Sequence, residues 1–144
     1  GIAGTFILIL FGSYIVGIGA GTSCASWPLC RGDIFPGGEM YMLHMIHRYI
    51  ALVVGLILLM ISIVAKFTLP KQSGIIRVSL LSNSIMLFQV LFGAIMIWAE
   101  FPSYLKAVHL SVATLLWISL IGLATIAYMT GVFRFHKMSH RCVD

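Results

Sequence analysis

The chain has 144 residues, of which 60% are hydrophobic and 9% are charged, and its formal net charge is +5. Its mean hydropathy is +1.07. A soluble domain of this length has one small core and cannot bury so much apolar surface, so the composition excludes soluble globular classes. The positive charge requires no nucleic-acid partner, because basic residues next to anionic lipid account for it. The composition predicts an integral membrane protein whose first partner is the lipid bilayer.

Four apolar runs follow one another along the chain, each of the length of about 20 residues that crosses a bilayer core. They cover about residues 2–20, 40–65, 75–99 and 103–130. The first run has no basic residue before it and no convincing cleavage site after it, which favours a helix over a signal peptide. We expect an all-α bundle of four transmembrane helices in one domain, residues 1–144, with a short basic tail.

The orientation of this bundle follows from its charges. Basic residues concentrate in the second connection and in the tail, at Lys66, Lys71, Arg77, Arg134, Lys137 and Arg141. The first and third connections instead mix Arg31 and Lys106 with acidic residues. Because Lys and Arg are enriched on the cytoplasmic side of membrane proteins, both termini are expected to face the cytoplasm of a cell with this protein in its plasma membrane.

The first connection carries the run Cys24-Ala25-Ser26-Trp27-Pro28-Leu29-Cys30. In the expected topology this connection lies outside the cell, where an oxidising environment lets the two cysteines pair, while Cys142 lies on the reducing side. A disulfide around the proline-containing turn would hold a lid over the outer mouth of the bundle. The alternative is a redox-active pair, which requires a reactive thiolate and a partner to exchange electrons with.

Two histidines lie at matching depth in the second and fourth runs. His47 is seven residues past Met40 and His109 six past Ser103, which places both roughly 9–10 Å below the outer helix ends. Because an apolar bilayer tolerates an imidazole only when its nitrogens are satisfied, the pair indicates a shared ligand, and a haem iron between parallel helices fits it. Arg48 can then meet a haem propionate. The alternative is that both rings hydrogen-bond to neighbouring carbonyls or hydroxyls.

Two further polar residues lie inside the apolar runs. His44 precedes His47 by three positions on the same helix face, one turn nearer the outside. It would bind a propionate, donate protons, or rest among the lipid headgroups. Gln89, about midway along the third run, would either hydrogen-bond across helices or line a substrate cavity. We include both residues among the candidates for haem binding.

Gly19-Ala20-Gly21 leading into the cysteine loop, His47-Arg48, Gln89 with Gly93, and His109 together resemble the haem A synthase family. The resemblance spans nearly the whole chain. Members of that family commonly have eight transmembrane helices in two similar four-helix halves, each with a histidine pair. Compact four-helix members, known from archaea, correspond to one half, and this chain resembles those.

The resemblance implies an oxidoreductase that converts the methyl group of haem O to the formyl group of haem A, which terminal oxidases use. It implies haem b, haem O or haem A as cofactor or substrate, and association with a haem-copper oxidase or its assembly machinery. A homo-oligomer would supply a second histidine pair. The alternative function is a non-catalytic b-type haem-binding subunit of a respiratory complex; a more distant one is a quinone-linked disulfide oxidase.

The sequence leaves more than one candidate for the catalytic group. The family's catalytic half typically carries a glutamate three residues before the histidine that matches His47, and this chain has His44 there. Glu39 and Glu100 are the carboxylates near the outer helix ends. His44, Glu39 and Glu100 are therefore the candidates for moving protons or stabilising charge during methyl oxidation.

Overall fold

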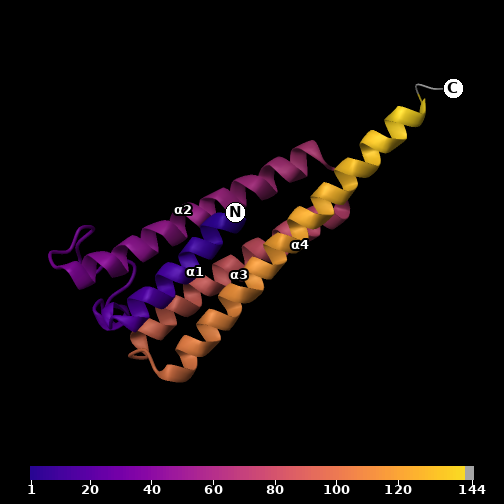
Figure 1. Cartoon of the computed structure of the whole chain (residues 1–144). Helices are drawn as coiled ribbons and strands as arrows, with labels where there is room; N and C mark the ends of the chain where they lie inside the picture. The colour runs from indigo at the N-terminus through magenta and orange to yellow at the C-terminus, as the bar shows by residue number, and fades with distance from the viewer. Residues whose placement is uncertain (142–144) are drawn as a thin grey trace.

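The computed structural model describes the backbone of residues 1–141 and the side chains of residues 1–131, and its described backbone is helical without a β-strand (Figure 1). The elements are α1 (Ile2–Gly17), the short 3₁₀ turn η1 (Ala20–Thr22), α2 (Glu39–Thr68), α3 (Ser73–Trp98) and α4 (Ser103–Arg141). Three of them, α2, α3 and α4, are long and apolar enough to cross a membrane, and α1 is a shorter apolar helix. The chain is a multi-pass membrane protein, as its composition predicts.

The helix ends differ from the sequence-based ranges at several places. The second helix ends at Thr68, three residues past its predicted end, and the third begins at Ser73, two residues before its predicted start. The first helix ends at Gly17, three residues before the predicted end, because Gly19 adopts φ 79° and turns the chain out of the helix. The last helix continues past the predicted end at Thr130 to Arg141, since no proline interrupts it. The side chains expected to form the basic tail, Arg134, Lys137 and Arg141, and all of Cys142 lie outside the described residues.

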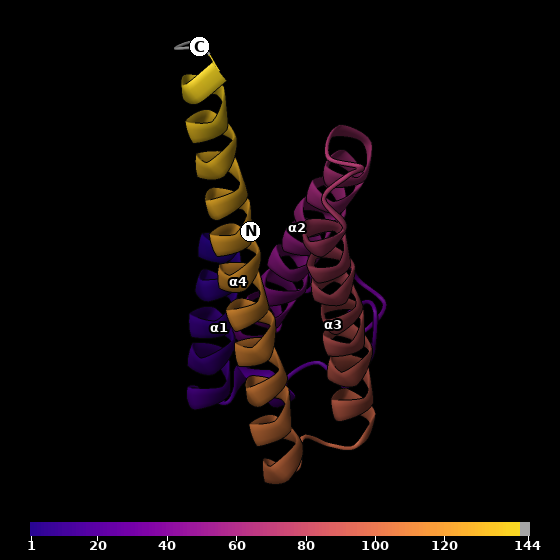
Figure 2. The ribbon, with the colours of Figure 1, turned by 90° about the vertical axis from the view of Figure 1, so that its right-hand side faces the viewer.

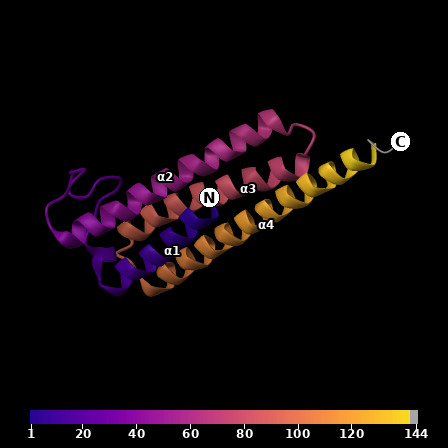
Figure 3. The ribbon, with the colours of Figure 1, turned by 45° about the horizontal axis from the view of Figure 1, so that its top comes forward.

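The four helices form a ring in which α1 packs against α2 and α4, and α3 packs against the same two helices. Figure 2 shows α1 beside α4 and α3 beside α2. The connections before α2 and before α4 lie at one end of the bundle, so these two helices run parallel on opposite sides of it (Figure 3). The N-terminus of α1 lies partway along the bundle. Side chains from α2 and α4 therefore face one another across the bundle axis.

The apolar core fills the half of the bundle away from these two connections. It consists of Val54, Leu58, Met86, Leu116 and Leu120, each at most 5% exposed. Beside it the hydroxyl oxygens of Ser82 and Ser119 lie 2.9 Å apart in a hydrogen bond between α3 and α4. Such interhelical hydrogen bonds satisfy polar groups that lipid cannot. The core and these bonds fix how α4 is rotated against its neighbours.

We expect Leu120→Ala to destabilise the protein by about 2–5 kcal/mol, because it leaves a cavity in a packed core. Leu115→Ala is the matched control, since Leu115 is on the same helix and 58% exposed. Thermal unfolding in detergent measures both. Equal losses in the two variants would contradict the packing described above.

Candidate functional site

A cavity of about 690 Å³ lies between the four helices, towards the end of the bundle that carries the α1–α2 connection. His47 of α2 and His109 of α4 both line it. The volume falls within the range of roughly 300–1,000 Å³ that is usual for ligand and cofactor sites. The structure thus brings the two predicted histidines to one cavity from opposite helices.

The ring of His47 is held by its neighbour α1. Phe11 stacks beside it, with 6.3 Å between ring centroids and 28° between planes. At Gly12 an added Cβ would lie 3.0 Å from Cε1 of His47, a contact so tight that the ring would have to shift. A glycine at this position therefore lets the imidazole lie directly against the backbone of α1.

His109 is held in the same way by α3. Phe92 stacks beside its ring, at 6.1 Å and 15°, and a Cβ at Gly93 would lie 3.3 Å from Cε1. Each histidine thus packs on a Phe-Gly pair of the preceding helix, within a Leu-Phe-Gly tripeptide that occurs at residues 10–12 and again at 91–93. Of these residues the sequence analysis identified only Gly93. The repeated tripeptide was the available signal for the others.

Neither imidazole has a hydrogen-bond partner in the described part of the chain. Nδ1 of His47 and Nδ1 of His109 are buried without a hydrogen-bond partner, and neither ring makes a hydrogen bond within residues 1–131. The alternative in which carbonyls or hydroxyls satisfy the rings is therefore not found in this part of the chain. Nε2 of each ring has no hydrogen-bond partner in the described structure either, but it is not among the fully buried atoms, so it is the nitrogen that a ligand in the cavity can reach. Coordination to a metal at Nε2 would supply a partner that the described residues do not.

The donor set fits a haem iron better than a bare metal ion. The described residues contain no group of three or more His, Cys, Asp or Glu side chains that could hold a metal ion. Two opposed histidines suit an iron that brings its own porphyrin nitrogens and needs only axial ligands. The residues present therefore fit a haem bound between α2 and α4.

Gln89 meets both expectations raised for it. Its Nε2 donates to the backbone carbonyl of His109 at 2.8 Å, which joins α3 to α4. It also lines the cavity, and its Oε1 is buried without a partner in the described structure. Gln89 thus fixes the backbone that carries His109 and leaves one acceptor at the cavity wall.

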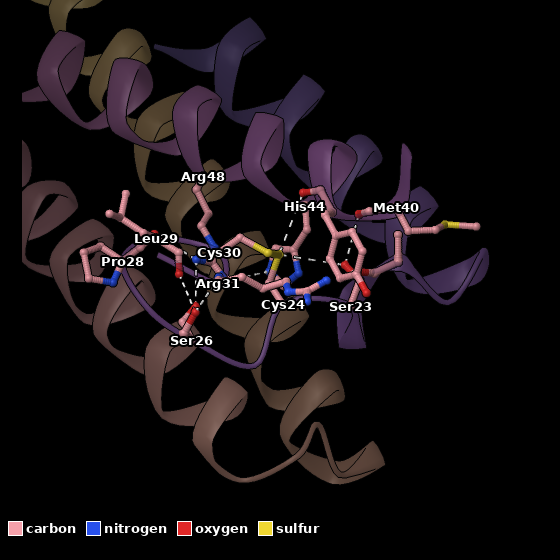
Figure 4. Close-up of a disulfide and its surroundings, with 12 residues drawn as sticks. Ser23, Cys24, Ser26, Pro28, Leu29, Cys30, Arg31, Met40, His44 and Arg48 are labelled. Carbon is pink, nitrogen blue, oxygen red and sulfur yellow. Dashed lines mark hydrogen bonds between the residues drawn. A yellow bond between two sulfur atoms is a disulfide. The ribbon is translucent and has the colours of Figure 1, made fainter. Parts of the chain in front are cut away.

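His44 and Arg48 line the same cavity at the end beside the α1–α2 connection. The His44 ring meets Phe101 edge to face at 6.0 Å, and its Nε2 is 3.5 Å from Nη2 of Arg48. Nη1 of Arg48 donates to the carbonyls of Ser26, at 2.9 Å, and Pro28, at 2.8 Å (Figure 4). Arg48 therefore binds the α1–α2 connection with part of its guanidinium group.

The α1–α2 connection forms the wall of the cavity at this end through Trp27, Pro28 and Leu29. Cys24 and Cys30 are joined in a disulfide, and neither has exposed surface. The bridge holds the two ends of this loop together next to Arg48 (Figure 4). We call the segment from Cys24 to Cys30 the disulfide loop.

The two carboxylate candidates lie elsewhere. Glu39 is the first residue of α2, and Glu100 lies in the α3–α4 turn with φ 60°. Both are exposed, and neither lines the cavity. Of the three candidate catalytic residues, the structure brings only His44 to the cavity.

The fold and site define a multi-pass membrane bundle whose cavity carries two opposed histidines under a disulfide loop. The model of the family COX15-CtaA, described as Cytochrome oxidase assembly protein, matches residues 38–121, which include both histidines. The chain belongs to this family, and the resemblance to haem A synthases is confirmed.

Two curated relatives carry the name Heme A synthase. The protein of Novosphingobium aromaticivorans is 25% identical over 128 residues, covering 75% of this chain and 35% of the relative. That of Shouchella clausii is 23% identical over 128 residues, covering 87% of this chain and 42% of the relative. The chain thus spans less than half the length of these relatives. No solved structure matches it significantly.

Replacing both Cys24 and Cys30 by serine should lower the stability of the protein by about 2 kcal/mol, the magnitude expected for a short closed loop. Thermal unfolding with and without reductant measures this change. We expect reductant to lower the midpoint of the native protein and to leave that of the double variant unchanged. If the unfolding midpoint of the native protein stays the same when reductant is added, the disulfide does not stabilise the loop.

Proposed function

We propose that this protein binds haem in the cavity, with His47 and His109 as its two axial ligands, and that it oxidises the methyl group of haem O to the formyl group of haem A. The observation that carries the proposal is the pair of half-buried imidazoles that face one cavity without hydrogen bonds in the described structure. Family membership supports the reaction, because two relatives carry the name Heme A synthase.

The residues around the cavity have distinct roles in this proposal. His47 and His109 bind the iron through neutral imidazole nitrogens, and the Phe-Gly pairs restrict how their rings rotate. The disulfide loop and Arg48 exclude water from the outer side. When bound, the haem iron and porphyrin supply the redox chemistry.

His44 is the proposed proton carrier. It is 5% exposed, lines the cavity one helical turn from His47, and its Nδ1 is buried without a partner in the described structure. Because a guanidinium only donates hydrogen bonds, Nε2 of His44 faces Arg48 as an acceptor and the neutral ring carries its proton on Nδ1. Nδ1 can release this proton and take it up again, the task that general acid–base catalysis requires. This assigns to His44 the part that the family's glutamate is positioned to play.

The proposal includes a topology. In it α2, α3 and α4 span the plasma membrane with α1 inserted beside them, both termini face the cytoplasm, and the disulfide loop lies outside. The basic residues of the α2–α3 connection and of the C-terminal segment support this orientation. A homo-oligomer would supply a second haem site, and product haem would pass to a haem-copper oxidase or its assembly machinery.

His47→Ala and His109→Ala should each abolish the absorption of six-coordinate low-spin haem, because either change opens one axial position. His44→Ala is the control on the same helix and should keep the low-spin spectrum. Absorption spectra of the haem-loaded proteins distinguish these outcomes, and circular dichroism checks that each variant is folded. Unchanged spectra in both variants would refute the ligation, and loss of the low-spin form in His44→Ala would indicate the wrong histidine.

Expression in cells that make haem O but lack their own haem A synthase should yield haem A, identified by mass in extracted pigment. His44→Phe should lower the yield at least about 100-fold, the typical contribution of a general acid or base. Extraction of haem b alone from the native protein, with a stable low-spin spectrum, would instead support the non-catalytic subunit.

A further inference from the structure

We propose that Lys106 and Arg48 form a two-sided clamp for the carboxylates of a haem, so that the porphyrin stands with its propionate edge towards the disulfide loop. This inference rests on the proposed function, because it concerns the same cavity. It adds a ligand-binding residue, Lys106, and fixes which way the bound haem points.

Lys106 lies where such a contact is needed. It is on α4 three residues before His109, which puts it on the same helix face one turn nearer the outer end. It is half-buried and lines the cavity. On α2 the corresponding position before His47 is His44, next to Arg48. Positive or protonatable groups therefore flank the cavity from both helices that carry the axial ligands.

No carboxylate in the described part of the chain neutralises this lysine. Asp33, Glu39 and Glu100 are all exposed, and none of them lines the cavity. A cationic ammonium at the wall of a largely apolar cavity gains most from an anionic ligand, because few water molecules compete for it. Lys106 thus indicates a ligand that carries negative charge.

Arg48 alone cannot bind both propionates. Its Nη1 already donates to the carbonyls of Ser26 and Pro28, and its Nη2 lies 3.5 Å from His44. Its Nε is buried without a partner in the described structure. The remaining donors suffice for one carboxylate, so the second propionate requires another cation, and Lys106 is on the opposite helix.

The inner end of the cavity excludes the opposite orientation. Ala51, Met86 and Leu116 line it there and belong to or pack against the apolar core. Burying a carboxylate among such side chains costs far more than burying the vinyl and methyl edge of a porphyrin. The charge distribution of the cavity therefore directs the propionates outward.

The test compares haem b with its dimethyl ester, in which both carboxylates are esterified. Each is titrated into the native protein, Lys106→Gln, Lys106→Arg and Lys71→Gln in detergent, with Kd measured from the Soret absorption. Lys71, in the α2–α3 turn, is the control cation. We expect Lys106→Gln to weaken haem b by about fivefold or more and to leave the ester unchanged. Lys106→Arg should restore the affinity, and Lys71→Gln should change neither ligand.

Three other results would contradict either the clamp or the proposed function. The clamp is overturned if Lys106→Gln binds haem b as tightly as the native protein does, and a retained low-spin spectrum would leave the proposed function intact. It is equally overturned if Lys106→Gln weakens haem b and its ester by the same factor, since the lysine would then act on the fold. Failure of the native protein to bind either ligand would refute the proposed function itself.

Discussion

An imidazole in the middle of a membrane protein must find a partner for its nitrogens, and two imidazoles of this chain find none in the described protein. The rest of the bundle is arranged around this constraint. The ring order of the helices places α2 and α4 on opposite sides, so that His47 and His109 face one cavity. Glycines under both rings allow them to lie against the neighbouring helices. A ligand that coordinates one nitrogen of each ring would fill the cavity and supply the missing partners.

The two ends of the cavity differ in polarity, and this difference gives the proposed site its direction. The end beside the disulfide loop carries His44, Arg48 and Lys106, whereas apolar side chains line the opposite end. Arg48 links α2 to the disulfide loop. It belongs to the same helix as His47 and donates hydrogen bonds to two carbonyls of the loop. The disulfide loop is therefore bonded directly to the helix that carries His47.

The sequence predicts the four helices and the histidine pair well, because long apolar runs leave few alternatives and depth along a helix follows from residue count. The end of α1 could not be predicted in the same way. It depends on the left-handed backbone conformation of Gly19, and the hydrophobic pattern of the sequence carries no information about that conformation. The stacking of Phe11 and Phe92 on the histidines depends on how each helix is rotated about its axis. Likewise, the bonds of Arg48 depend on the path of the disulfide loop, which only the folded chain defines.

The most direct test of the central claim is the position of the iron in a structure of the haem-loaded protein. Anomalous diffraction at the iron absorption edge locates it without assumptions about the porphyrin. We predict a single peak between α2 and α4, coordinated by one ring nitrogen of His47 and one of His109. A peak coordinated by His44, or by only one of the two predicted histidines, would contradict the account.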